Sequence, residues 1–230
     1  MSFLENAFTA NNTKIYRRVQ DFLAVVTLLS ILSLVLETVP ALSSYHKFFV
    51  FVEWLAVLIF SFEYLARLKV SHPKWKYPLS FFGIIDLVAI LPTFIGLGNF
   101  TFLKSARALR IIRMLRMMRL AKMSRRGLVS EKDTSILALN VIIYFAVLLT
   151  ALLFTGTAMY LVEPNISAFS SIPAGMWWSL KVFMAGIQVV EPSTFLGEIF
   201  FVLTRFIGLL LLGLLVGVVG NVFRIILIEK

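Results

Sequence analysis

The amino-acid sequence predicts an all-α membrane protein with six transmembrane helices and a short helix that enters the membrane and returns. Of its 230 residues, 60% are hydrophobic and only 15% are charged, with a mean hydropathy of +0.92. This composition is too apolar for one soluble core. Apolar stretches of about 20 residues, the length of a membrane-crossing helix, recur six times along the chain. A further apolar stretch is broken by proline and glycine, so we expect it to be re-entrant.

Each expected span is a run of predominantly apolar residues that is long enough to cross the hydrocarbon core of a bilayer. The spans cover residues 21–39, 48–68, 79–97, 103–123, 136–161 and 199–228. The first span ends at Pro40, which cannot continue a helix. The re-entrant stretch lies between the last two spans, covers residues 172–198 and begins with IPAGMWW.

The loop charges predict how the spans are oriented. With six crossings, most basic loop residues fall on one side of the membrane, namely Lys14, Arg17, Arg18, Arg67, Lys69, Lys74, Lys76, Arg125, Arg126, Lys132, Arg224 and Lys230. Positively charged loops stay on the cytoplasmic side. The opposite side carries Lys47 and Lys104 against the acids Glu163, Glu191 and Glu198. We therefore expect a multi-pass protein of a plasma or inner membrane with both termini cytoplasmic.

The fourth span carries a ladder of cations in the stretch RALRIIRMLRMMRLAKMSR. A basic residue recurs at every third position: Arg107, Arg110, Arg113, Arg116, Arg119, Lys122 and Arg125. A charge at the bilayer centre costs between about 3 and 17 kcal/mol, so such a segment needs acidic partners, water or lipid phosphate. A helix lying on an anionic leaflet is one alternative, but a three-residue period winds the charges around an α-helix instead of forming one wet face. Nucleic-acid binding is not expected, because hydrocarbon side chains separate the cations.

Acidic partners stand at matching depths in the second and third spans. Glu53 and Glu63 lie ten residues apart on one helix, separated by about 15 Å, and Asp86 lies within the next span. Static ion pairs are one interpretation of such buried acids. Alternatively, one acid serves successive bases, which requires the ladder to move by about 4.5 Å per step of three residues. A membrane potential can drive that motion, because each charge moved through 100 mV contributes about 2.3 kcal/mol. The pattern thus favours a voltage sensor in which Arg110, Arg113, Arg116 and Arg119 cross the field.

Several motifs in the chain resemble those of known channels. IFSFEYLAR in the second span, FFGIIDLVAILPTFI in the third and LRIIRMLRMMRLAKMSR in the fourth resemble the sensor of voltage-gated potassium channels. IPAGMWW and FLGEI resemble the pore helix and the start of the inner helix in the same family. The likeness covers residues 21–223. The chain is therefore identified as a member of the voltage-gated ion channel superfamily, closest to the six-span voltage-gated potassium channels.

This resemblance implies a domain organisation and an assembly. A cytoplasmic segment of residues 1–20 precedes a four-helix voltage sensor over residues 21–123. A linker helix over residues 124–136 then leads to a two-helix pore domain over residues 137–230. The family's assembly implies a homotetramer.

The resemblance also implies roles for individual residues. Phe60, Glu63 and Asp86 would form a charge-transfer site, a gap past which the ladder side chains step singly, and Glu53 would be an outer countercharge. The gating hinge of the inner helix would lie at Gly208, Gly213 and Gly217, with Gly220 as a further bending point. Close helix packing is an alternative explanation for these glycines.

The selectivity filter is where the sequence departs from the family. Potassium channels carry a Thr-Val-Gly-Tyr-Gly signature whose carbonyl groups replace the water around the ion. The corresponding stretch here consists of Ala185, Gly186, Ile187, Gln188, Val189, Val190 and Glu191. Ile187, Val189 and Val190 are β-branched and disfavour the positive φ angles that glycine permits. We therefore do not expect a potassium-selective carbonyl ladder.

Glu191 is the residue expected to select ions instead. On four-fold assembly it would form a ring of carboxylates that concentrates cations, and Gln188 could add a ring of amide oxygens. The string QVVE loosely resembles a bacterial sodium-channel filter. A solvated loop carboxylate is the alternative interpretation of Glu191.

Two basic residues lie near this mouth. Lys181 in the re-entrant helix and Arg205 in the sixth span could pair with Glu191 or Glu198 and hold the outer pore together. If they faced the pore, they would oppose cations and favour anions. Trp177 and Trp178 are expected to be packing and interface anchors.

The sequence as a whole predicts a voltage-gated cation channel that is non-selective or sodium-permeable. Its partners would be the lipid bilayer, monovalent cations and identical subunits, with no nucleic acid, cofactor or metal. The alternative is a channel-like protein whose pore does not conduct and which acts as a membrane voltage sensor or a proton leak. We expect no enzyme, because His46 and His72 lack metal-ligand spacing or a catalytic partner.

Overall fold

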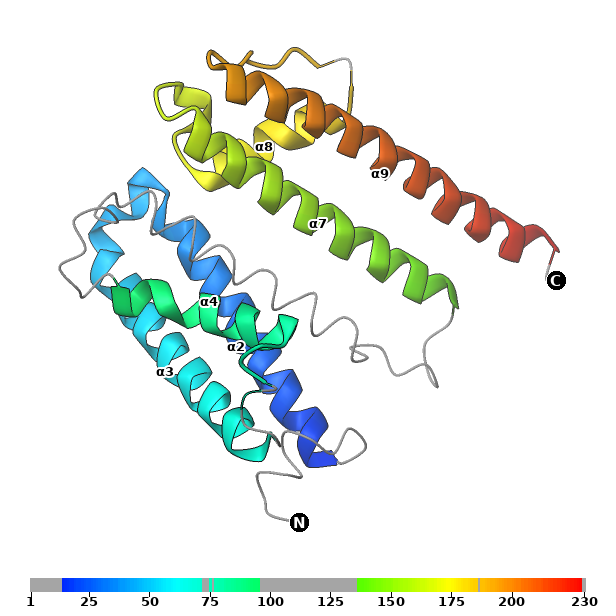
Figure 1. The fold of residues 1–230 in the computed structure, drawn as a ribbon. Coiled ribbons are helices and arrows are strands. Elements are labelled where there is room, and N and C mark those ends of the chain that lie inside the picture. Colours follow the sequence, from blue (N-terminus) through cyan, green and yellow to red (C-terminus); the bar gives the residue numbers. More distant parts are fainter. Residues whose placement is uncertain (1–13, 72–74, 76, 96–135, 186, 229–230) are drawn as a thin grey trace. The chain divides into compact units, whose positions relative to one another are not determined.

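The computed structural model describes residues 14–71, 75, 77–95, 136–185 and 187–228. Every regular element in these ranges is a helix (Figure 1), which confirms the all-α prediction. The α-helices are α2 (Lys14–Glu37), α3 (His46–Val70), α4 (Phe81–Ile95), α7 (Ile136–Val162), α8 (Ile172–Phe183) and α9 (Phe195–Ile228). Two short 3₁₀ helices, η1 (Pro40–Tyr45) and η4 (Ser167–Phe169), lie in the connections.

Four of the described segments are long and apolar enough to cross a membrane. They are Lys14–Glu37, Pro40–Val70, Asn140–Val162 and Phe195–Arg224, and they coincide with the first, second, fifth and sixth expected spans. Helix α4 coincides with the third, but its 15 described residues extend only about 23 Å. The fourth expected span and the linker helix of residues 124–136 lie outside the described residues. The count of six therefore stays a prediction.

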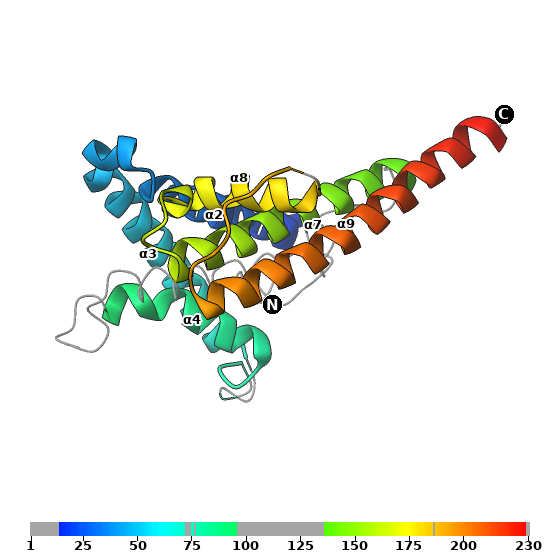
Figure 2. The same cartoon turned by 90° about the horizontal axis from the view of Figure 1, so that it is seen from above.

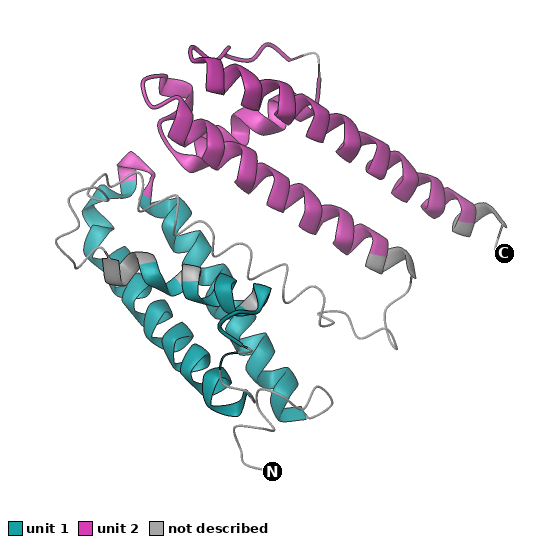
Figure 3. Cartoon of the chain, in the orientation of Figure 1, with its two compact units in different colours: residues 1–37, 42–128 teal, residues 38–41, 129–230 magenta. Residues whose placement is uncertain are grey.

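The chain forms two compact units (Figure 3). The first comprises Met1–Glu37 and Leu42–Leu128, and the second comprises Thr38–Ala41 and Val129–Lys230. The domain boundary expected between residues 123 and 137 falls largely outside the described residues, so its position also stays a prediction.

In the first unit, α3 packs against both α2 and α4. Helix α2 turns a stripe of buried residues inward at helical spacing, including Leu23, Thr27 and Ser30. The Thr27 hydroxyl donates a hydrogen bond to the Leu23 carbonyl at 2.7 Å, so this polar group is satisfied within its own helix. The core around Phe60 of α3 includes Ile90 of α4, and Val26 of α2 packs against the same cluster.

In the second unit, α7 and α9 run antiparallel and α8 packs against both (Figures 1 and 2). Helix α8 is preceded by Ser171, whose side chain accepts a hydrogen bond from Ala174 N at 3.3 Å. This is the N-cap that the helix terminus requires. With 12 residues, α8 is about 18 Å long, which is too short to cross a bilayer. It has the length and position expected of the re-entrant helix.

Two glycines allow α7 and α8 to touch through their backbones. A Cβ atom added at Gly175 of α8 would lie 2.3 Å from the carbonyl oxygen of Gly156 on α7. A Cβ atom added at Gly156 would lie 2.5 Å from the Met176 backbone nitrogen. Small residues at a crossing permit such close approach in membrane proteins. The crossing brings α8 against α7 so that Trp178 reaches the core around Met159.

The outer faces of the helices are apolar. On α9, for example, Leu209 is 64% exposed and Leu210 is 75% exposed. Contiguous exposed patches of large apolar side chains are rare on soluble monomers, whereas a bilayer or a neighbouring subunit covers them readily. The described residues therefore have the surface of a multi-pass membrane protein.

The Gly156–Gly175 crossing makes a prediction about stability. Replacing Gly175 with Ala should lower the free energy of unfolding by about 1–3 kcal/mol, because overpacking would push α8 away from α7. Thermal unfolding in detergent, followed by tryptophan fluorescence, measures the change. The matched control is Gly213→Ala, since an added Cβ there meets nothing within 4 Å. Equal melting temperatures for the two variants would contradict the assigned crossing.

Candidate functional site

The packed face of α3 carries charge, while its outer face is apolar. Glu53, Phe60 and Glu63 are buried and lie on one stripe of the helix, with the spacing that places side chains on one face. The opposite stripe contains Leu58 and Phe62, which are 60% and 68% exposed. In a soluble amphipathic helix the apolar side chains face inward and the charged ones face water, so the polarity of α3 is reversed. Ionisable residues buried in a membrane helix usually mark a functional site.

Glu63 forms an ion pair within the same helix. Its Oε1 lies 2.6 Å from Nη2 of Arg67, and both side chains are buried. The sequence interpretation counted Arg67 among the cytoplasmic loop charges, whereas the structure places it within the last turn of α3, where it is only 6% exposed. The signal that could have identified the pair is the four-residue spacing of acid and base. The ion pair compensates one buried carboxylate with a fixed cation.

Asp86 of α4 is fully buried and hydrogen-bonded. The Tyr77 hydroxyl, from the turn before α4, donates to Asp86 Oδ2, and Asp86 is 0% exposed. Arg67 also interacts electrostatically with Asp86 and Tyr77. The four groups therefore form one buried cluster at the α3–α4 contact. Sequence reasoning missed Tyr77, because nothing local to the turn indicates what its hydroxyl reaches.

The structure places the expected charge-transfer residues Phe60, Glu63 and Asp86 on the buried faces of α3 and α4. Phe60 is 0% exposed within an apolar cluster. It lies about one turn before Glu63 and about two turns after Glu53 on α3. The buried apolar cluster around Phe60 thus lies between Glu53 and the acidic cluster of Glu63 and Asp86 along the helix pair. The seven ladder cations, from Arg107 to Arg125, lie outside the described residues.

In the second unit, Trp178 anchors the segment that follows α8. Its indole Nε1 donates a hydrogen bond to the Val190 carbonyl at 2.9 Å. Its ring packs edge-on against Phe169, with 5.1 Å between centroids and 77° between planes, and also contacts Phe201. Such pairs add to the stability gained by burial. The end of the expected filter is therefore fixed to α8.

The described residues of the expected filter lie in a loop outside any helix, and most of them are exposed. Ala185 adopts φ of 45°, the left-handed conformation that usually follows a helix C-terminus. Among the described residues other than glycine, it alone has positive φ, as expected from the β-branched residues that follow. Ile187, Gln188, Val190 and Glu191 are exposed within one chain. Gly186 lies outside the described residues.

Glu163, at the end of α7, is a buried carboxylate that accepts several hydrogen bonds. It is 1% exposed, and its oxygens accept bonds from the Ser193 backbone at 3.0 Å and the Ser193 hydroxyl at 2.7 Å. The Thr194 backbone and hydroxyl each donate at 2.7 Å. Gly197 leaves room for the carboxylate, because a Cβ there would lie 2.1 Å from Glu163 Oε1. The sequence interpretation counted Glu163 only as an outer loop charge, whereas it joins the end of α7 to the start of α9.

The ionised form of Glu163 is the stable one. Burial by itself raises the pKa of this carboxyl, but the hydrogen bonds from Ser193 and Thr194 outweigh that effect and hold the pKa below its ordinary value. The positive end of the α9 helix dipole lies at the same position and also favours a negative charge.

The other expected residues of the mouth are placed as follows. The guanidinium of Arg205 lies 4.7 Å from the ring centre of Phe201, a cation–π contact. Within the described part of one chain, no ion pair joins Arg205 or Lys181 to Glu191 or Glu198.

The expected hinge glycines of α9 differ in their surroundings. An added Cβ at Gly208 would lie 2.9 Å from Phe183 Cα, so close packing against α8 accounts for this glycine. Added Cβ atoms would meet open space within one chain at Gly213, Gly217 and Gly220.

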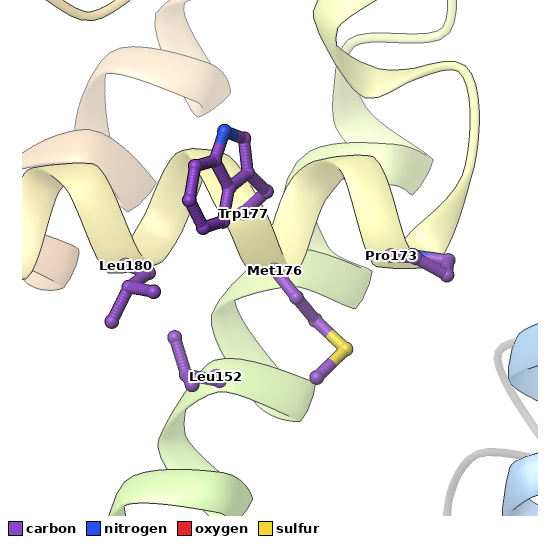
Figure 4. Close-up of a pocket in the computed structure, with 5 residues that line it drawn as sticks. All are labelled: Leu152, Pro173, Met176, Trp177 and Leu180. Carbon is purple, nitrogen blue, oxygen red and sulfur yellow. The ribbon is translucent and has the colours of Figure 1, made fainter.

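An apolar hollow of about 230 Å³ lies between α7 and α8 (Figure 4). Met176 and Leu180 of α8 point toward Leu152 of α7 in this view, and Trp177 and Pro173 complete the lining. The lining consists of apolar and aromatic side chains and contains no acidic or basic group. In the residues that the structure describes, no group of three or more potential metal ligands is found either.

Buried charge on an interior helix face, apolar outer faces and a short helix between two long ones define a channel-like membrane protein. Comparison with known families agrees, because the model of the ion transport protein family matches residues 17–226. The chain belongs to this family. It is a member of the voltage-gated ion channel superfamily, close to the potassium channels.

Named relatives support the same assignment. A protein of Rhodopseudomonas palustris named "Putative potassium channel protein" is 30% identical over 224 residues, which cover 89% of this chain and 53% of the relative. The Drosophila melanogaster potassium voltage-gated channel protein Shal is 30% identical over 241 residues, covering 95% and 41%. The human A-type voltage-gated potassium channel KCND3 is 28% identical over 245 residues, covering 95% and 36%. The chain thus spans about half, or less, of the length of these relatives.

The Glu163 contacts predict a pH-dependent stability. Because the native pKa lies below the ordinary value of 4.5, ionisation stabilises the fold; this contribution is complete above pH 4.5 and is lost as the pH falls through the native pKa. Glu163→Ala should cost about 2 kcal/mol at pH 7, since it removes hydrogen bonds to an ionised group, and should remove the acid-dependent loss. Thermal unfolding across pH 3 to 7 tests this. Glu191→Gln, which changes an exposed carboxylate nearby, is the control, and an identical acid sensitivity of the Glu163 variant would contradict the assignment.

Proposed function

We propose that this chain is the subunit of a homotetrameric voltage-gated cation channel with six spans and both termini in the cytoplasm. Residues 21–123 would form the sensor, residues 124–136 the linker helix and residues 137–230 the pore. The observation that carries the proposal is the buried acidic face of α3, with Phe60 between Glu53 and Glu63. Membership of the ion transport protein family supports it.

The sensor would work by moving one ladder cation at a time past Phe60. The two carboxylates Glu63 and Asp86 and the guanidinium of Arg67 together carry a net charge of −1. That charge attracts a single further cation strongly and a second one much less. The apolar surroundings of Phe60 exclude water, so the membrane potential falls over a short distance and acts on the crossing side chain.

The energy available is sufficient for gating. Three or four charges moved in each of four subunits contribute roughly 28 to 37 kcal/mol per 100 mV. Arginine suits this task because it stays ionised at any accessible pH. We expect the linker helix to transmit the motion to α9, where Gly213 and Gly217 are free to bend within one chain, whereas Gly208 packs against α8.

The gating charges can be tested one at a time. Arg113→Gln or Arg116→Gln should lower the charge displaced per subunit by about a quarter to a third, since three or four charges cross the field. Displacement currents, normalised to the number of channels, measure this quantity. Arg126→Gln is the matched control, because Arg126 lies outside the three-residue ladder. An unchanged displacement in the Arg113 and Arg116 variants would remove these residues from the sensor.

The pore is proposed to be non-selective or sodium-permeable. The relatives are named as potassium channels, but this chain lacks the Thr-Val-Gly-Tyr-Gly signature. Its loop has positive φ at Ala185 and at none of the described β-branched residues, so backbone carbonyls are poorly disposed to form successive ion sites. Glu191 is exposed beside the Val190 anchor, and four copies would place carboxylates around the mouth.

Ion selectivity is tested by reversal potentials in planar bilayers with opposed potassium, sodium and chloride gradients. We expect a reversal between the sodium and potassium potentials, and Glu191→Gln should shift it or lower the conductance by removing the anionic ring. Glu198→Gln, in the first turn of α9, is the control and should leave the permeability ratio unchanged. A reversal at the potassium potential would contradict the filter assignment. One at the chloride potential would place Lys181 and Arg205 in the pore.

A further inference from the structure

We propose that Tyr77 is a positioning residue of the charge-transfer site, whose hydroxyl competes with the ladder cations for the carboxylate of Asp86. This inference rests on the proposed function, because it concerns how the same site releases each cation. It assigns a role to the turn between α3 and α4, which lies in the chain between Arg67 and Asp86.

The geometry places the hydroxyl of Tyr77 directly on the buried acid. Tyr77 lies nine residues before Asp86, yet its hydroxyl donates a hydrogen bond to Asp86 Oδ2. Its ring lies 5.7 Å from the ring of Tyr64 on α3, at an angle of 50°. The side chain is thus held between α3 and α4 and reaches the acid from the end of the helix pair.

The turn that carries Tyr77 is folded tightly onto the start of α4. The Ser80 hydroxyl donates to the Tyr77 carbonyl at 2.7 Å and accepts a hydrogen bond from Gly83 N at 3.0 Å, which caps the helix. A Cβ atom at Gly83 would lie 1.8 Å from the Tyr77 carbonyl oxygen. Only glycine therefore permits the turn to approach this closely, and the position of the phenol is built into the fold.

The phenol is a neutral donor under all ordinary conditions. Burial raises the pKa of Tyr77 far above its usual value; the guanidinium of Arg67 opposes that shift in part, and the charge and hydrogen bond of Asp86 add to it. The hydroxyl therefore keeps its proton and offers a hydrogen bond without a charge. The negative charge of Glu63 also raises the pKa of Tyr77.

Competition by a neutral donor has a kinetic consequence. A carboxylate binds a guanidinium most tightly when no other donor satisfies its oxygens. With one oxygen held by Tyr77, Asp86 attracts each arriving cation but releases it more readily. The barrier to the next step of the ladder is lowered in both directions, while the number of charges that move is unchanged.

The test is Tyr77→Phe in the full-length channel, with displacement currents recorded during steps to and from depolarised potentials. We expect charge movement to slow about tenfold in both directions, the effect of losing one hydrogen bond to an ionised group, with the total displaced charge unchanged. Tyr45→Phe, at an exposed tyrosine of η1, is the matched control and should keep the wild-type rates.

A second variant works in the opposite direction and preserves the size of the side chain. A ring-fluorinated tyrosine at position 77 is a stronger hydrogen-bond donor, so it should speed charge movement. A double-mutant cycle then locates the effect: in the Asp86→Asn background, Tyr77→Phe should change the rates less than roughly twofold, because the ionised acceptor is gone.

Three results would overturn the inference. The first is a rate of charge movement in Tyr77→Phe that matches the rate in Tyr45→Phe. The second is that Tyr77→Phe slows charge movement equally in the wild-type and Asp86→Asn backgrounds. The third is that the fluorinated tyrosine at position 77 slows charge movement. The inference and the proposed function fail in different ways. If the wild-type channel moves no charge, the voltage-sensor assignment fails; if it moves charge normally and Tyr77 has no influence, only the role of Tyr77 fails.

Discussion

The arrangement of this protein depends on how ionised side chains are stabilised where water is excluded. A carboxylate or guanidinium buried in apolar surroundings must find an opposite charge or several hydrogen bonds, or it changes its protonation state. Glu63 lies against Arg67, and Asp86 accepts from Tyr77. Glu163 accepts from two residues at the start of α9. The outer faces of the helices remain apolar because lipid offers no such partners.

The two units meet this requirement in different ways, and the difference matches their proposed roles. In the first unit two buried acids, Glu63 and Asp86, face one described cation, Arg67, which suits the proposed attraction of a moving cation. In the second unit Glu163 is saturated by donors from Ser193 and Thr194, so it is stabilised in one place. The first arrangement suits exchange of partners, and the second suits a rigid outer mouth.

The expected filter is shaped by its anchors as much as by its own residues. Trp178 holds the carbonyl of Val190, and Glu163 holds the backbone of Ser193 and Thr194. The intervening loop therefore starts from α8 and ends on α9 at fixed points, although it lacks the glycines of the potassium-channel signature. A fixed loop with an acidic residue beside its anchor can select by charge without a carbonyl ladder.

Local patterns in the chain were sufficient for the helices and for part of the site. Apolar runs of membrane length predicted α2, α3, α7 and α9, because side-chain polarity along a helix is a property of neighbouring residues. The acids Glu53 and Glu63 were singled out as charges within an apolar span, and Phe60 by the resemblance to channel sensors. The partners of the buried groups were decided only in three dimensions. Tyr77 reaches Asp86 through a turn that Gly83 permits, and Glu163 meets donors 30 residues away. A hydrogen bond depends on where two elements cross, and no local spacing records that geometry.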